Sequence, residues 1–102
     1  MSPFFSVIIT AYNYGRFIEQ AIESVIRQEG ILSEEREIIV VDDGSTDDTA
    51  QRLARFTSEI VLVKQENSGQ AASINAALSV CRGEVAVFLD ADDYFYLLQC
   101  LI

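Results

Sequence analysis

The aspartates of this chain gather in two short segments. All seven lie within residues 42–48 or 90–93, whereas the glutamates are scattered over the rest of the chain. Carboxylates that converge on one cleft repel one another strongly where the dielectric constant is low, and a bound divalent cation relieves that repulsion. Mg²⁺ and Mn²⁺ prefer oxygen ligands and commonly use one or two carboxylates together with substrate phosphates. The distribution therefore predicts a Mn²⁺ or Mg²⁺ site beside a phosphate-bearing ligand.

Asp90 and Asp92 are a pair that suits such a site. They lie two residues apart at the end of a predicted strand, where a period of two lets both carboxylates point the same way. One carboxylate can then hold the metal while the other accepts hydrogen bonds from a ligand hydroxyl. An isolated Asp-x-Asp often does no more than cap a loop. Here the pair follows a buried strand and lies opposite Asp42 and Asp43, which favours the functional interpretation.

The other acidic segment contains two pairs with different expected roles. Asp47 and Asp48 precede a predicted helix, where negative charge is favourable, and we interpret them mainly as capping residues. Asp and Ser side chains also stabilise turns, and Gly44 permits a positive φ. Asp42 and Asp43 are explained less easily in this way, so we expect at least one of them to contact a ligand.

The residues that follow the predicted strands at 6–11 and 60–63 have both a functional and a purely structural interpretation. Tyr12 either stacks on a nucleobase or is a half-exposed loop aromatic, and Asn13 suits a helix N-cap. Ser68 and Gly69 stand at a predicted helix start. The free backbone N–H groups there either bind an anion or are capped without any ligand.

The segments that position these residues show two alternating patterns of apolar residues. Short apolar runs rich in β-branched residues predict strands covered on both faces, at 6–11, 37–41, 60–63 and 84–89. Apolar pairs that recur every four residues predict a helix over 17–26. A short helix follows Asp47 or Asp48 and carries Ala50, Leu53, Ala54 and Phe56. A third helix runs from an N-cap at Ser68 to about Arg82, with Gly83 at C′ and a buried face of Ala71, Ile74, Leu78 and Cys81.

The predicted order β-α-β-α-β-α-β indicates an α/β fold, an open parallel Rossmann-like sheet with helices on both faces. In such sheets ligands bind beyond the carboxyl ends of the strands, where all the candidate residues lie. The 102 residues are enough for one domain, and neither a composition break nor a linker divides them.

Charge and composition exclude several classes of function. The net charge of −9 disfavours binding to nucleic acid or to anionic membranes. The chain has no His, the commonest general base and zinc ligand. Its two Cys form no CxxC pair. No apolar run is long enough for a membrane helix, so we expect a cytoplasmic domain, whose longer parent protein can still associate with a membrane.

Five segments together resemble the start of a family 2 glycosyltransferase of the GT-A fold. They are SVIITAYN at 6–13, FIEQAIESVIRQ at 17–28, EIIVVDDGSTDDT at 37–49, ENSGQAASIN at 66–75 and GEVAVFLDADD at 83–93. The resemblance covers about residues 4–93 and implies the strand order 3-2-1-4. It also implies transfer of a sugar, with inversion at the anomeric carbon, from a nucleotide-sugar donor to an acceptor that is a saccharide, a lipid or a protein.

The resemblance implies a role for each candidate residue. Asp43, together with Asp42, would hydrogen-bond the base, typically uracil, although thymine and guanine stay open. Asp90 would contact the ribose, and Asp92 would bind the Mn²⁺ or Mg²⁺ that bridges the diphosphate. The nucleoside pocket would be lined by Thr10, Ala11 and Tyr12, and the rest of the nucleotide-sugar set would be Asn67, Gly69 and Ala91.

The chain departs from the family pattern in two ways. Many members carry a basic residue before the Asn of the third helix, whereas this chain has Ile74, which we interpret as a core residue. The family also continues past the Asp-x-Asp segment into an acceptor-binding portion with a carboxylate general base. No residue of this chain fills that catalytic role. We therefore expect a donor-binding portion that is active only within a longer parent chain.

Two other functions compete with this interpretation. A non-catalytic nucleotide-sugar-binding module, or an inactive truncated remnant, would keep the same motifs. A phosphorelay receiver domain needs Asp after its first and third strands and a late Lys, whereas the only Lys here is Lys64. We also expect a homo-oligomer, joined through an unpaired strand edge at 84–89 or through the apolar C-terminal segment 94–102.

Overall fold

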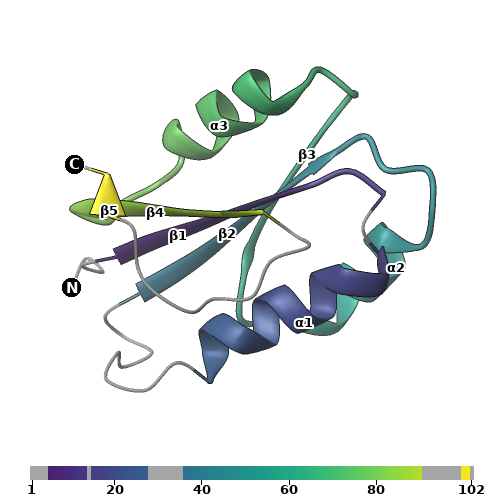
Figure 1. Ribbon diagram of the computed structural model, residues 1–102, viewed down its shortest axis with the longest axis horizontal. Coiled ribbons are helices and arrows are strands. Elements are labelled where there is room, and N and C mark those ends of the chain that lie inside the picture. Colours follow the sequence, from purple (N-terminus) through teal and green to yellow (C-terminus); the bar gives the residue numbers. More distant parts are fainter. Residues whose placement is uncertain (1–4, 14, 28–35, 91–99, 102) are drawn as a thin grey trace.

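Four parallel strands and one short antiparallel strand form a single sheet. The computed structural model describes residues 5–13, 15–27, 36–90 and 100–101. The order across the sheet is β3-β2-β1-β4-β5 (Figure 1), in which β1 to β4 pair in parallel. The strands are β1 (Phe5–Ala11), β2 (Arg36–Asp43), β3 (Val61–Gln65), β4 (Val85–Asp90) and β5 (Cys100–Leu101). The predicted α/β fold and the strand order 3-2-1-4 are confirmed.

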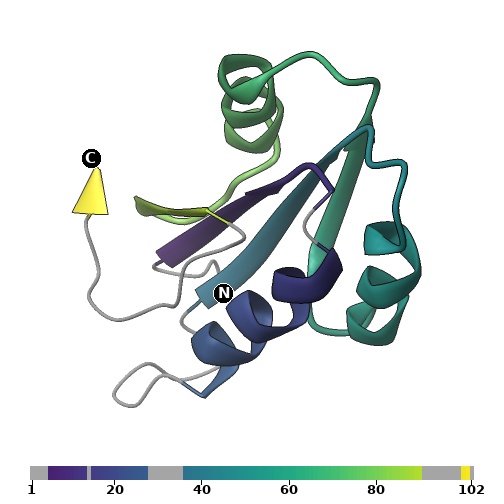
Figure 2. The same cartoon turned by 45° about the vertical axis from the view of Figure 1, so that its right-hand side comes forward.

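The helices cover both faces of this sheet. α1 (Gly15–Ile26) and α2 (Thr49–Leu53), which continues into the 3-10 turn η2 (Ala54–Phe56), lie on one face, and α3 (Gln70–Leu78) lies on the other (Figures 1 and 2). The crossovers from β1 to β2 and from β2 to β3 run one way across the sheet, whereas the crossover from β3 to β4 runs the other way, so right-handed connections place α3 on the opposite face. Among the described residues, no helix is both long enough and apolar enough to cross a membrane.

Alternate residues of β2 pack into two separate cores. Ile38 and Val40 belong to the larger core beneath α1 and α2, whereas Ile39 and Val41 belong to the smaller core beneath α3. Successive side chains of a strand point to opposite faces. The same alternation places Asp42 on the α1 face and Asp43 on the α3 face, so the two acids at the end of β2 lie in different surroundings.

The structure corrects the predicted boundaries of the third helix. α3 begins at Gln70 with Gly69 as its N-cap, and no side-chain hydrogen bond caps it. The predicted cap, Ser68, instead donates its hydroxyl to the carbonyl oxygen of Glu66, 2.7 Å away. The helix ends at Leu78, well before Arg82, so Gly83 is not a C′ residue. Gly83 lies against β1 instead, where an added Cβ would come within 2.6 Å of the backbone nitrogen of Ser6.

The predicted buried face of this helix is also wrong. Ser73 and Ala77 are its buried residues, while Leu78 is 44% exposed and Ala71 is exposed. Ile74 is half-buried and lies outside both buried cores. Small side chains on the sheet side let the helix approach the strands closely, which turns its larger apolar residues outward.

The β4 edge is partly covered, which corrects the expectation of an unpaired edge at 84–89. β5 pairs with β4 in antiparallel register, with Leu101 opposite Ala86 and Cys100 opposite Val87. Most of the apolar segment 94–102 lies outside the described residues.

Candidate functional site

The carboxyl ends of four parallel strands bring most of the predicted site residues to one edge of the sheet. In the register of the sheet, Ala11 is paired with Asp42, Thr10 with Asp90, and Asp43 with Gln65. Tyr12 follows directly after β1 and is 44% exposed. The sequence therefore placed these residues correctly at a common edge. Ala91 and Asp92 lie outside the described residues, so their predicted roles are not tested.

Asp43 is the centre of a hydrogen-bond network on the α3 face. Its carboxylate is buried, and Oδ1 accepts hydrogen bonds from Gln65 Nε2 and from the Ser68 backbone N–H, both at 2.8 Å. Oδ2 accepts from the Gly69 N–H at 3.0 Å and from Asn67 Nδ2 at 3.4 Å. Asp43 thus holds the whole loop between β3 and α3, including the predicted site residues Asn67 and Gly69.

These donors stabilise the charged form of Asp43. The hydrogen bond from Gln65 is the largest cause that lowers the pKa of Asp43 from its usual value of 3.8. Burial opposes this effect, and the backbone N–H groups of Ser68 and Gly69 lower the pKa further. Asp43 is therefore an anion at neutral pH, and its negative charge is stabilised by groups of the protein itself.

Gln65, Ser73 and Gln70 are site residues that sequence reasoning missed. Gln65 Nε2 donates to Ser73 Oγ at 3.1 Å as well as to Asp43, and Ser73 Oγ donates to the Gly69 carbonyl oxygen at 3.0 Å. The Thr10 hydroxyl donates to Gln70 Oε1 at 3.2 Å. The predicted third strand ended at residue 63, two residues short of Gln65. A strand longer by two residues would have placed Gln65 beside Asp43.

Asp42 is in different surroundings from its neighbour. It is 5% exposed, faces the α1 side, and accepts a hydrogen bond at Oδ1 from the Ser45 backbone N–H, 3.0 Å away. This bond closes the turn that follows β2, where Gly44 has a φ of 76°. An Ala at Gly44 would bring its Cβ within 2.6 Å of the Asn67 backbone nitrogen, so the turn is packed closely against the β3–α3 loop.

Asn13 joins the loop after β1 to the loop after β2. Its Oδ1 accepts hydrogen bonds from the backbone N–H groups of Thr46 at 2.7 Å and Asp47 at 3.2 Å. Its own N–H donates to Ser45 Oγ at 3.0 Å. Asn13 has a left-handed φ of 57°, a conformation that Asn tolerates better than most residues. The prediction that Asn13 is an N-cap is therefore wrong: α1 begins two residues later, at Gly15, and the Asn13 side chain binds the neighbouring loop instead.

Asp47 completes this connection from the other side. Its Oδ2 accepts a hydrogen bond from the Gly15 N–H at 3.2 Å, and its Oδ1 accepts one from the Thr49 N–H at 2.9 Å. The Asp47 side chain therefore accepts hydrogen bonds from the first residues of both α1 and α2. The Thr49 hydroxyl is the main cause that lowers the pKa of Asp47 from 3.8; burial opposes it, and the Thr49 and Gly15 N–H groups add to the lowering. This supports the prediction that Asp47 caps a helix.

The metal site stays a prediction. Among the described residues, no group of three or more His, Cys, Asp or Glu side chains could hold a metal ion. Asp92, the predicted ligand, lies outside those residues, and Asp90 is placed only by its backbone pairing with Thr10. The chemistry of the predicted donors, carboxylate oxygens, does suit Mg²⁺ or Mn²⁺.

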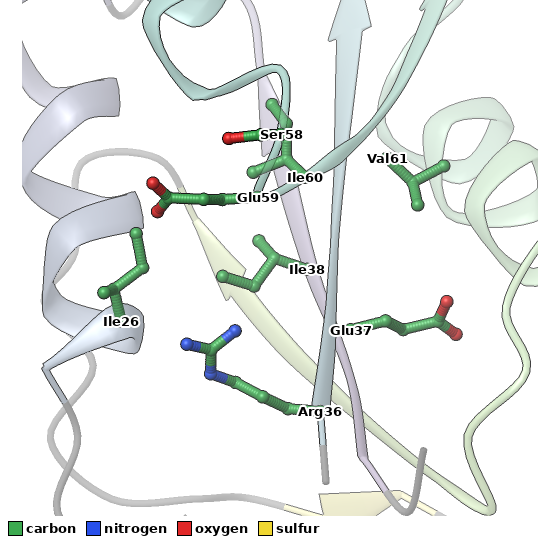
Figure 3. Close-up of a pocket in the computed structure, with 8 residues that line it drawn as sticks. All are labelled: Ile26, Arg36, Glu37, Ile38, Ser58, Glu59, Ile60 and Val61. Atoms are coloured by element: carbon green, nitrogen blue, oxygen red, sulfur yellow. The ribbon is translucent and has the colours of Figure 1, made fainter. Parts of the chain in front are cut away.

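A hollow of about 540 Å³ opens at the opposite end of the sheet and takes no part in this site. Figure 3 shows Arg36, at the start of β2, on the same side of the strand as Ile26 and Ile38. Within the described part of the chain, Arg36 Nε is buried without a hydrogen-bond partner. The candidate functional site is the edge formed by the carboxyl ends of the strands.

Comparison with known proteins identifies the family of this chain. The family model described as glycosyl transferase family 2 matches residues 6–97. An uncharacterized glycosyltransferase of Nostoc sp. is 41% identical over 92 residues, which are 86% of this chain and 28% of that relative. The chain thus spans little more than a quarter of the length of this relative.

Solved structures give the same result for the fold. Staphylococcus aureus TarS in complex with UDP-GlcNAc has a TM-score of 0.79 and 36% identity, over 89% of this chain and 27% of the TarS chain. A mannosyltransferase of Pyrobaculum calidifontis in complex with GDP-Man and Mn²⁺ also has a TM-score of 0.79, with 30% identity, over 93% of this chain and 29% of the other. The fold corresponds to the N-terminal part of these GT-A enzymes, and the chain belongs to glycosyl transferase family 2.

Proposed function

We propose that this chain is the donor-binding portion of a glycosyltransferase that transfers a sugar from a nucleoside-diphosphate sugar to an acceptor, with inversion at the anomeric carbon. The observation that carries the proposal is the convergence of Thr10, Asp42, Asp43 and Asp90 on adjacent strand ends, beside the exposed Tyr12. An edge with hydrogen-bond acceptors and an exposed aromatic ring suits a nucleoside, whose base can stack and whose polar atoms need fixed partners.

Each predicted residue has a distinct role in this proposal. Asp43, together with Asp42, accepts hydrogen bonds from the base, for which uracil is our first expectation. The longest bond to Asp43, from Asn67 Nδ2 at 3.4 Å, is the one that a base N–H would replace most easily. Asp90 accepts from the ribose. The nucleotide-sugar site is completed by Thr10, Ala11, Tyr12, Asn67, Gly69 and Ala91.

In this proposal the diphosphate needs positive charge in addition to that of Lys64, which is paired with Asp42 in the register of the sheet. Ile74, where many members of the family carry a basic residue, is a half-buried apolar residue within α3 and offers no positive charge. We propose that Mn²⁺ or Mg²⁺, held by Asp92, supplies this charge and acts as a Lewis acid on the departing nucleoside diphosphate. The Mn²⁺ in the Pyrobaculum calidifontis mannosyltransferase complex supports the choice of metal.

The acceptor and the general base belong to another part of the parent protein in this proposal. Inverting transfer requires a base that takes the proton of the acceptor hydroxyl. In this proposal Asp43 contacts the nucleobase, Asp47 accepts internal hydrogen bonds, and the chain has no His. The short span of the chain relative to its relatives supports a separate acceptor-binding portion. We expect no repeated turnover by these 102 residues alone.

Calorimetric titration of the chain with UDP, GDP and dTDP in the presence of Mn²⁺ tests this proposal. We expect UDP to bind most tightly and Asp43→Asn to weaken its binding. Glu37→Gln is the matched control, because Glu37 is a buried acid at the opposite end of β2 that accepts hydrogen bonds from Ser6 and Arg82. If none of the three nucleotides bound, the proposal would be wrong.

A non-catalytic nucleotide-sugar-binding module is the alternative, and the same residues would support it. Transfer by the parent protein distinguishes the two, because only the enzyme would form a glycosylated product over many turnovers.

A further inference from the structure

The two loops that flank the proposed nucleoside site are joined by a hydrogen-bonded cluster that core packing does not explain. We call it the loop clamp, and it consists of Asn13, Gly15, Ser45, Thr46 and Asp47. Its bonds connect residues 32 to 34 positions apart in the sequence. Asn13 and Thr46 are exposed, so the clamp buries little apolar surface. Its main effect is on the relative position of the two loops.

The clamp is attached directly to the residues proposed to contact the nucleoside. Tyr12 immediately precedes Asn13, whose N–H donates to Ser45 Oγ. The N–H of the same Ser45 donates to Asp42 Oδ1 at 3.0 Å. A short path of hydrogen bonds therefore runs from the backbone beside Tyr12 to the carboxylate of Asp42.

We propose that Asn13 is a positioning residue for nucleoside binding, which acts by holding Tyr12 and Asp42 at a fixed separation before the ligand arrives. This inference rests on the proposed donor-binding function. Loops that are already ordered lose less conformational entropy when the ligand binds, and the affinity is higher for that reason. Without the carboxamide oxygen of Asn13, the backbone N–H groups of Thr46 and Asp47 lose their acceptor. Only the Asn13 N–H to Ser45 and the Gly15 N–H to Asp47 then remain of the clamp, so the two loops are held less firmly.

The test is the substitution Asn13→Gly. Gly adopts the left-handed φ of 57° without strain, so the variant removes the carboxamide and leaves the backbone conformation accessible. We expect the Kd of UDP, measured by calorimetry with Mn²⁺, to rise about tenfold. The variant loses hydrogen bonds between uncharged groups, and the loops must then become ordered when the ligand binds. The Kd of UMP should rise by the same factor, because the clamp acts on the nucleoside and not on the diphosphate.

Two further variants separate positioning from simple loss of stability. Asn13→Asp keeps a side-chain oxygen that accepts from Thr46 and Asp47, and it should restore most of the affinity. Ser45→Ala removes a single acceptor and should weaken UDP binding by a smaller factor, which keeps the test usable if Asn13→Gly fails to fold. Glu37→Gln alters the Ser6 and Arg82 contacts at the far end of the sheet. It should lower the melting temperature without changing the Kd.

The outcomes distinguish this inference from the function on which it rests. An unaltered Kd in folded Asn13→Gly and Ser45→Ala would overturn the positioning role while the donor-binding function stands. An equal rise of the Kd in Glu37→Gln would also overturn it, because general destabilisation would then account for the effect. If the unaltered chain bound neither UDP nor UMP, the proposed function and this inference would fail together.

Discussion

At the scale of single residues, the acids of the site are stabilised in different ways by the protein. Asp43 accepts hydrogen bonds from Gln65, Asn67 and two backbone N–H groups, whereas Asp42 accepts one from Ser45. The sequence could predict that Asp43 matters, because it ends a buried strand. Its partners were not predictable, because they come from a loop and a strand more than 20 residues away, and only the register of β2 and β3 brings them together.

Asp43→Asn should reduce the loss of stability in acid. The folded-state pKa of Asp43 is lower than the unfolded value, so its contribution to stability is complete above about pH 4 and is lost as the pH falls through the folded-state pKa. The variant lacks this contribution at every pH. The difference between the free energies of unfolding at pH 6 and pH 3, from urea titrations, should therefore be smaller than in the unaltered chain. An unchanged difference would mean that Asp43 is not preferentially ionised in the fold.

Arg36→Met should stabilise the protein by about 1 kcal/mol. The substitution removes a buried donor, Arg36 Nε, that has no partner among the described residues. It leaves an apolar side chain in the hollow lined by Ile26 and Ile38. Arg82→Met is the matched control. Arg82 is mostly exposed, and its Nε lies 3.5 Å from Glu37, so its loss should change the free energy of unfolding by less than about 0.5 kcal/mol. A clear loss of stability in Arg36→Met, measured by urea unfolding, would show that the guanidinium is stabilising.

At the scale of the elements, the strands were predicted better than the third helix. Uninterrupted apolar runs identify the buried strands because both of their faces are covered. The apolar residues of α3 gave the wrong face, since Ala71, Ile74 and Leu78 repeat with the spacing of a core stripe but Ser73 and Ala77 are the residues that are buried. The helix packs closely on the sheet, and only small side chains fit between them. The hydroxyl of Ser73 is hydrogen-bonded to the Gly69 carbonyl oxygen and to Gln65. A count of apolar positions alone cannot predict this outcome.

Gly83→Ala should destabilise the connection from α3 to β4. Its Cβ would lie 2.6 Å from the backbone nitrogen of Ser6, so β1 or the connection must move, at a cost of about 2–3 kcal/mol. Gly69→Ala is an informative comparison, because nothing lies within 4 Å of its added Cβ and only its φ of 96° is unfavourable. That variant should lose about 1 kcal/mol. Thermal and urea unfolding of both variants measure the difference, and a smaller loss for Gly83→Ala would contradict the close contact with β1.

At the scale of the whole molecule, the site lies along one end of the sheet, and β4 is an edge strand but for the short strand β5. β5 covers that edge at Ala86 and Val87. Sequence reasoning predicted the edge but not its partner, because a strand of two residues has no periodic signal. Pairing of β5 with β4 of the same chain therefore competes with pairing of β4 with a second copy.

We still expect a homo-oligomer, formed by exchange of the C-terminal segment or through the uncovered part of β4. Deletion of residues 95–102 removes β5, and it should change the distribution of oligomers in light scattering at about 100 μM protein, a concentration at which a specific edge contact is populated. A clean monomer before the deletion would contradict self-association, and pairing of β5 within one chain would then explain the result.

We predict that the acidic edge of the sheet binds a nucleoside diphosphate through a divalent cation. The most direct measurement is calorimetric titration of the chain with UDP, once with Mn²⁺ and once with EDTA. We predict measurable binding with Mn²⁺ and hardly any with EDTA, because the chain has 16 acidic and seven basic residues and offers the diphosphate little positive charge of its own. Asp92→Asn should abolish the dependence on Mn²⁺. Equal affinity for UDP in Mn²⁺ and in EDTA would contradict the claim.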